Sequence, residues 1–311
     1  MEGLFSAYLA KAVAMVDASE PWGKIEAAAV ADSGPAQAKA LGAWLAEDIV
    51  QQGAPKGAAD APAMRARAAA AERAVAEAVA KLAAPTEASG LAPAAEEARE
   101  GLVELFAGEV DRLGEAVHEG FTKASGSPVV HIRRGLTLAD VLPEGSRNER
   151  VRFAKPPAAP PGLALEPVAN LRQDAARLKH YALHDAAARG GRAHSIAASS
   201  TYFKSIRPPV SLDGDLSEFR AMSGIANAAD AWCDAARAGL ASGFVERLKT
   251  RQSAALLGPA NETAAVLKAL EIERAVADLN GALAADPSSA IIPAEGLLAL
   301  VVGGGLGGAT L

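Results

Sequence analysis

Apolar residues recur along most of this chain at three- and four-residue spacing, which predicts a helical protein. Residues 64–84 form an Ala-rich run with interspersed Glu and Arg, and this composition favours one continuous helix. In residues 94–124 the apolar side chains fall on one helix face: Leu102, Phe106, Val110, Leu113 and Val117.

Three more helices are predicted in the second half of the chain. Asn170 followed by Gln173 fits a helix cap with its capping-box partner, so a helix is expected to begin there. Residues 218–251 and 261–285 continue the helical pattern, and the Asp286-Pro287 pair is expected to end the last of these helices.

Only two segments predict strands, PVVHI at 128–132 and RVRF at 150–153. Pro- and Gly-rich stretches at 53–63, 155–162 and 207–215 are expected to be loops. The predicted fold class is therefore mainly α, a helical body with a small β-ribbon inserted in its middle.

Composition and charge narrow the function classes. Half of the residues are apolar but only 4% are aromatic, which indicates a core of Leu, Val and Ala. The net charge of −6 argues against generic nucleic-acid binding, which needs a broad basic face. A single cysteine, Cys233, argues against a disulfide framework and a Cys-rich metal site, and a cytoplasmic protein fits.

Neither end of the chain predicts a membrane segment. Residues 1–16 carry an acid and no basic leader, unlike a signal peptide. Residues 290–311 hold one charge, but Pro293, Glu295 and several glycines interrupt the unbroken apolar helix that a membrane anchor requires. We expect a packed last helix here and no membrane partner.

Four segments resemble, in order, the C-terminal lobe of bacterial maltokinases, which belong to the aminoglycoside-phosphotransferase-like kinases. RRGLTLADVL at 133–142 is similar to the catalytic loop and keeps its apolar positions. The other three segments are RFAKPP at 152–157, LRQDAARLKHYALHDAAA at 171–188, and residues 268–300. The resemblance spans about residues 30–300 and implies a kinase-like C-lobe without the family's N-terminal lobe.

The same resemblance implies that the phosphotransfer chemistry is lost. The family's catalytic aspartate falls on Gly135 and its metal-binding aspartate on Arg152. Its second metal ligand falls on Asp140, which could still ligate. Because phosphoryl transfer needs a positioned base and Mg²⁺ on the phosphates, we expect no ATP-dependent kinase, no metal and no cofactor.

Cations concentrate in and after this loop, and the strongest candidates to bind an anion are Arg133, Arg134, Arg152 and Lys155. Arginine binds phosphate, sulfate or carboxylate with paired hydrogen bonds, so a site for an anionic small molecule is predicted. The alternative is that several of these side chains lie on solvated ribbon edges.

The candidate bases are Asp140, Asp174 and His131. Asp174 falls close to a family aspartate that orders the catalytic loop, so a structural role is the alternative. His131 sits on the strand that enters the loop and could face the site, the core or the solvent. His180 and His184 lie one turn apart, but no third ligand is evident and no metal site is expected.

Two functions follow from this reading. One is a repurposed bacterial enzyme that performs an elimination, cyclisation or transfer on a phosphorylated or sulfated small molecule. The other is a pseudokinase scaffold without chemistry, bound through residues 1–45 to a second copy or to another protein. A third interpretation, a helical binding module unrelated to kinases, would lack the central β-ribbon.

The expected domains are a helical interface segment at 1–60 and the kinase-like lobe at 61–311, or one domain over 1–311. Leu4, Phe5, Tyr8 and Leu9 fit the proposed interface.

Overall fold

The computed structural model describes residues 33–84, 93–144, 150–156, 158–189, 216–258, 260–285 and 290–302. Its helices are α3 (Ser33–Gln51), α4 (Ala61–Ala83), α5 (Pro93–Phe106), α6 (Val110–Lys123), α7 (Glu166–Arg189), α10 (Leu216–Thr250), α11 (Ala260–Ala285) and α12 (Ile291–Val302). Two 3₁₀ turns, η1 (Leu138–Asp140) and η2 (Ala254–Leu257), complete the helical elements of these ranges. The predicted mainly α body is confirmed.

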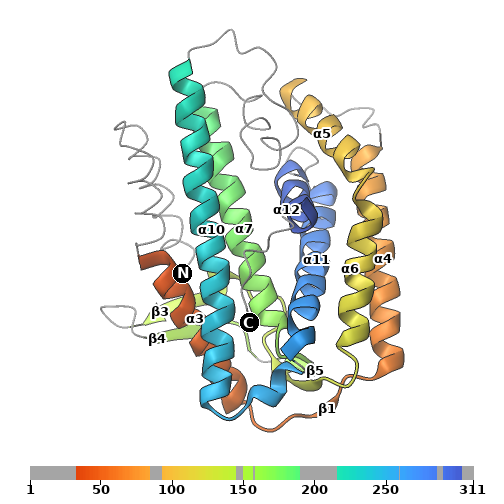
Figure 1. Cartoon of the computed structure of the whole chain (residues 1–311), viewed down its shortest axis with the longest axis vertical. Coiled ribbons are helices and arrows are strands. Elements are labelled where there is room, and N and C mark those ends of the chain that lie inside the picture. The colour runs from red at the N-terminus through yellow and green to blue at the C-terminus, as the bar shows by residue number, and fades with distance from the viewer. Residues whose placement is uncertain are drawn as a thin grey trace.

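The helix α7 runs through the middle of the body (Figure 1). It packs on α10, α11 and α12, while α3 covers α10 and the pair α4 and α6 lies against α11 on the opposite side. Large aromatic side chains fill the core, with Phe106, Phe121, Trp232 and Phe244 fully buried. Leu, Val and Ala make up most of the rest, as the composition indicates.

The strands form two small antiparallel sheets near one end of the helical body (Figure 1). One sheet has the order β1 (Gly57–Ala58), β2 (Pro128–Ile132), β5 (Ala158–Leu163), and the other pairs β3 (Val141–Glu144) with β4 (Arg150–Phe153). Both predicted strands are confirmed, but they belong to different sheets and do not form one ribbon.

The strand β5 was expected to be part of a loop because its sequence, AAPPGL, is rich in proline. Among the described residues it pairs only with β2, at the edge of the sheet, with an irregular register between Val130 and Ile132. An edge strand has one unpaired side, so missing proline N–H groups are tolerated there.

Two helix boundaries differ from prediction. The apolar face over 94–124 is split between α5 and α6 by a turn at residues 107–109. The helix α7 begins at Glu166, so Asn170 lies inside it and is not its cap. An acid at the N-terminus and Pro167 in the first turn both favour a helix start at this point.

Glycines allow α3 and α10 to pack with almost no side chain between their backbones. A Cβ placed on Gly42 would lie 2.9 Å from the amide nitrogen of Phe244, and one on Gly243 would lie 2.8 Å from the carbonyl carbon of Lys39. The approach is reciprocal, one glycine from each helix. This contact fixes the position of α3 on the rest of the core.

The proposed boundary at residue 60 stays a prediction, although the buried residues of α3 join the same core as those of α10. Leu4, Phe5, Tyr8 and Leu9 lie outside the described residues. The expected packed last helix is α12, whose Ala294, Leu297 and Leu298 are buried. Within the described ranges, no helix combines the length and the apolar character needed to cross a bilayer.

Candidate functional site in the loop between β2 and β4

The loop that follows β2 keeps the apolar skeleton seen in the sequence. Leu136, Leu138 and Val141 are fully buried, and Leu142 is half-buried. Gly135 adopts a left-handed backbone conformation, with φ of 58°, which glycine reaches without strain. The loop is therefore held in shape by core packing and one glycine turn.

A buried carboxylate of α7 binds the backbone of the loop. Asp174 Oδ2 accepts a hydrogen bond from the backbone N–H of Leu138 at 2.7 Å. Burial raises the pKa of Asp174 to about 6, although the Leu138 N–H and the guanidinium groups of Arg274 and Arg177 oppose the increase. Asp174 thus holds the backbone of the loop at Leu138, and its role as a base stays a prediction.

The second candidate base, Asp140, is occupied by the loop itself. Its Oδ2 accepts hydrogen bonds from the N–H of Thr137 at 2.8 Å and from the hydroxyl of Thr137 at 2.7 Å. Partial burial alone would raise its pKa, but these bonds and the Lys155 ammonium outweigh it and hold the pKa below the usual range. A carboxylate of low pKa is a weak general base near neutral pH.

Lys155 lies at the centre of the site. Its Nζ is 3.1 Å from Oδ2 of Asp140 and donates a hydrogen bond to the backbone carbonyl of Gly135. The resemblance places the catalytic aspartate and a metal ligand at these two positions. The Lys155 ammonium therefore lies between the backbone of Gly135 and the carboxylate of Asp140.

Arg133 is the most completely bound cation of the loop. Its Nε and Nη2 donate to the two carboxylate oxygens of Asp48 in α3, at 2.9 and 2.8 Å. Its Nη1 donates to the carbonyl of Lys155, and its guanidinium lies 5.2 Å from the ring centre of Phe153. Asp48 was not predicted, because it lies 85 residues upstream and no local pattern marks it.

The other two predicted arginines lie apart from this cluster. Arg134 is exposed, and its Nη2 is 3.3 Å from the carbonyl of Pro161. Arg152 is exposed between the half-buried Val151 and Phe153, so strand alternation places it on the face opposite to Phe153. The structure therefore links the Arg133 guanidinium to the backbone of Lys155, whereas Arg152 lies on the other face of its strand.

His131 also faces away from the core. Its neighbours in β2, Val130 and Ile132, are both buried, whereas His131 itself is half-buried on the other face of the strand. Its proposed role as a base stays a prediction, as does the common anion site of the four cations.

A network of buried charged side chains joins α7, α10 and α11 in the interior. It was not predicted from the sequence. Glu271 of α11 accepts from Arg172 of α7 and, at 3.0 Å, from Arg237 of α10. Lys179 pairs with Asp230 at 3.1 Å across the same α7–α10 contact. The sequence pattern that could have predicted this network is a charged residue on the apolar face of each of these helices.

Histidine and carboxylate groups do not gather into a metal site in the described part of the chain, where no three such ligands lie together. His180 instead pairs with Glu295 of α12, with Nδ1 and Oε2 3.0 Å apart.

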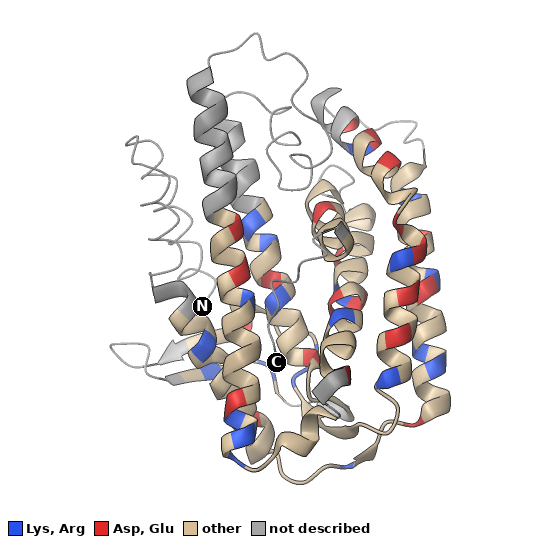
Figure 2. Cartoon of the chain, in the orientation of Figure 1, with Lys and Arg blue, Asp and Glu red and all other residues tan. Residues whose placement is uncertain are grey.

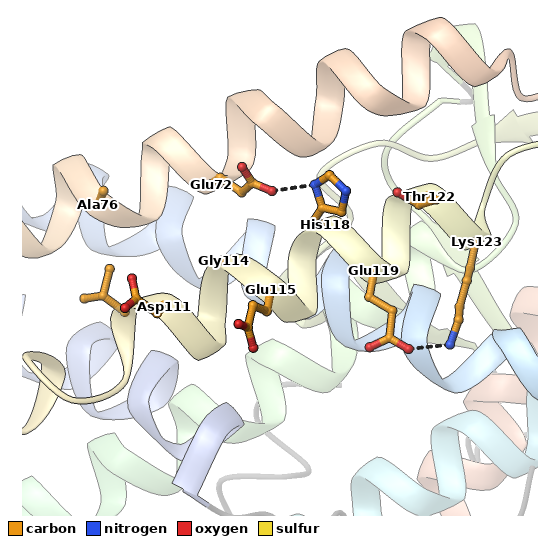
Figure 3. Close-up of a pocket in the computed structure, with 10 residues that line it drawn as sticks. Glu72, Ala76, Asp111, Gly114, Glu115, His118, Glu119, Thr122 and Lys123 are labelled. Atoms are coloured by element: carbon orange, nitrogen blue, oxygen red, sulfur yellow. Dashed lines mark hydrogen bonds and ion pairs between the residues drawn. The ribbon is translucent and has the colours of Figure 1, made fainter.

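A groove of about 760 Å³ lies elsewhere, between α4 and α6 (Figure 3). Four of its lining residues are acidic, Glu72, Asp111, Glu115 and Glu119, and the pair of Glu72 with His118 spans it at 2.7 Å. Basic and acidic side chains are interspersed along both helices (Figure 2). The groove shares no residue with the loop and adds nothing to its chemistry.

Comparison with known proteins shows the fold. A glucosamine kinase structure matches 93% of this chain with a TM-score of 0.58 and 14% sequence identity. A second structure, of glucosamine kinase in complex with glucosamine, ADP and inorganic phosphate, matches with a TM-score of 0.57 and the same identity. The chain has a mainly α, kinase-like fold.

The two kinase chains are much longer than the part of them that this chain matches. The chain spans 56% and 55% of the length of these two kinase chains. No protein-family model matches the sequence, and no curated protein matches it either. The similarity to glucosamine kinases supports a kinase-like fold, and the narrower resemblance to maltokinases stays a prediction.

Proposed function

We propose that this chain is a kinase-like lobe that binds an anionic small molecule, phosphorylated or sulfated, and does not transfer phosphate from ATP. The observation that carries the proposal is the position of Lys155, whose ammonium bridges the Gly135 carbonyl and the Asp140 carboxylate. A cation held there competes with a metal ion for the same oxygens, and Gly135 offers no side chain as a base.

The fold itself is compatible with such ligands. A similar structure, a glucosamine kinase, is described in complex with a sugar, a nucleotide and inorganic phosphate. In this chain the cations that support anion binding are Arg133 and Lys155, and the exposed Arg134 follows Arg133 directly in sequence. Arginine and lysine bind phosphate or sulfate oxygens through charge-assisted hydrogen bonds.

Chemistry beyond binding has weaker support. Asp140 has a lowered pKa, and Asp174, with a pKa of about 6, is buried and bonded to the loop backbone. Asp174 is therefore the better-tuned candidate base for an elimination, cyclisation or transfer, whereas His131 lies on the face of β2 opposite to the buried Val130 and Ile132. Binding without turnover is the function that the geometry supports best.

A second candidate, a scaffold without a ligand, is favoured by one observation. Arg133 and Lys155 each have a carboxylate partner from within the chain, Asp48 and Asp140 respectively. Charges that neutralise one another in this way hold the loop and α3 together even when no ligand is bound. A protein partner would then contact surfaces outside this site.

Calorimetric titration with inorganic phosphate, sulfate, Mg-ADP and Mg-ATP, beside an ATP-dependent phosphorylation assay on maltose and glucosamine, tests the proposal. We expect phosphate or sulfate to bind and no sugar to be phosphorylated. Lys155→Met should weaken phosphate binding severalfold. The matched control is Lys123→Met, which removes a lysine from an exposed carboxylate pair on α6 and should change nothing.

ATP-dependent phosphorylation of either sugar would refute the non-kinase proposal. If no anion binds while the protein is folded, the scaffold is the remaining function. A ligand that binds only the native state also raises the melting temperature, so thermal unfolding gives an independent measurement of the same binding.

A further inference from the structure

The pairing of Arg133 with Asp48 has the geometry of an occupied anion site. Two donors of one guanidinium edge, Nε and Nη2, meet the two oxygens of one carboxylate at 2.9 and 2.8 Å. Phosphate and sulfate present two oxygens to the same edge in the same way. The carboxylate thus fills the position that an oxyanion ligand would take.

Arg133 has supports that do not depend on Asp48. The third donor group, Nη1, bonds to the backbone carbonyl of Lys155, and the guanidinium lies over the ring of Phe153. An arginine held by a carbonyl and an aromatic ring keeps its orientation when its anion is exchanged. The exchange also brings the ligand close to the residue whose ammonium bridges Gly135 and Asp140.

Asp48 is placed where a carboxylate does not help its own helix. It lies in the last turn of α3, which contains no basic residue. The C-terminal end of a helix carries partial negative charge, so an acid there is unfavourable. Its side chain and that of Arg133 are 15% and 14% exposed, so the pair is mostly covered and only a narrow edge of it reaches solvent.

We infer that Asp48 is an internal competitor for the anion site, and that a phosphate or sulfate group binds Arg133 by displacing its carboxylate. The inference rests on the proposed anion binding and adds how that binding is regulated. Ligand binding would break the direct link between the loop and α3, while α3 stays packed on α10. In the absence of ligand the site is closed by the chain's own carboxylate.

Displacement has a quantitative consequence. The apparent dissociation constant of a ligand equals its intrinsic value divided by the fraction of open sites. If the Arg133–Asp48 pair is closed nine-tenths of the time, removal of the carboxylate should tighten phosphate binding about tenfold.

The test is calorimetric titration of inorganic phosphate, and separately of sulfate, into the full chain at constant ionic strength. We expect Asp48→Ala to bind phosphate about tenfold more tightly than the wild type. The gain should be lost in the double variant Asp48→Ala/Arg133→Gln. Glu246→Ala removes one carboxylate from the exposed pair with Lys39 and controls for net charge; it should match the wild type.

Each outcome of this titration supports or overturns the displacement of Asp48. Wild-type binding that is not tightened in Asp48→Ala overturns the inference and leaves the proposed function in place. A gain that persists in the double variant also overturns it, because Arg133 is then not the receptor. Absence of phosphate and sulfate binding in every variant overturns both the inference and the proposed anion binding.

A measurement on the wild-type protein covers the case in which Asp48→Ala does not fold. The ¹⁵Nε–¹H resonance of Arg133 reports directly on the partner of that N–H. We expect saturation with phosphate to shift this resonance as the carboxylate is replaced. A resonance that stays unchanged while calorimetry records binding would contradict displacement.

Discussion

Gly243→Ala should destabilise the protein, although alanine is the better helix former. A Cβ at this position would lie 2.8 Å from the carbonyl carbon of Lys39, whereas ordinary contacts begin at 3.4 Å. Both groups are backbone or attached to it, so neither can rotate away. The helices α3 and α10 would have to move apart along a contact that also includes Gly42.

The expected change in the free energy of unfolding is the difference between a packing cost and a gain in helix propensity. Overpacking a core contact costs about 1–3 kcal/mol, and separating two packed surfaces by about 1 Å forfeits up to half of each dispersion well. The gain in helix propensity returns at most about 1 kcal/mol. We expect a net loss of about 2 kcal/mol, or a fall of about 4 °C in melting temperature.

The assay is thermal and urea unfolding followed by far-UV circular dichroism. The matched control is Gly281→Ala in α11, where nothing lies within 4 Å of the added Cβ, and there we expect a gain of up to about 1 kcal/mol. If Gly243→Ala is as stable as the wild type, the backbone approach of α3 and α10 is not what holds them. If both variants lose stability equally, the effect is not one of packing.

Two further predictions concern buried charges. Because Asp174 has a folded pKa of about 6, above its unfolded value, its contribution to stability is complete below pH 4 and is lost as the pH rises through 6. Relative to Asp174→Asn, the wild type should lose about 2–3 kcal/mol of unfolding free energy between pH 4 and pH 7, measured by urea denaturation; a constant difference would contradict the shift. Glu271→Gln removes the common partner of Arg172 and Arg237 in the interior, and we expect a loss of about 3–5 kcal/mol in thermal unfolding. A melting temperature within 2 °C of the wild type would show that water reaches those guanidinium groups.

Periodicity predicted the helices and the two strands because those segments bury one face. Of the predicted series over 94–124, Leu102, Phe106, Leu113 and Val117 are fully buried, whereas Val110 is half-buried beside the turn that separates α5 from α6. The start of α7 and the edge strand β5 were not predicted correctly. The strand β5 forms because β2 offers it a free edge, and this information lies more than 20 residues away in the sequence.

The candidate site was predicted from a resemblance to a kinase family. The residues of this chain that pair with the site's cations could not be predicted from the sequence. The outward position of Arg152 was readable, because it alternates with Val151 and Phe153 in a strand. Asp48 was not, because the ion pair depends on how α3 packs against the loop. That packing depends in turn on backbone contact at Gly42 and Gly243.

The apolar side chains of the loop serve the folded core. Leu136 and Leu138 fill the core and Asp174 satisfies the Leu138 N–H, and neither contact uses a side chain at position 135. An aspartate at this position would not act as a free base, because a Cβ on Gly135 would lie 3.7 Å from Nζ of Lys155. The new carboxylate would pair with that ammonium and stay ionised. Gly135→Asp should therefore remain negative in the ATP-dependent phosphorylation assay, and activity in this variant would show that Lys155 does not lie between Gly135 and Asp140 as described.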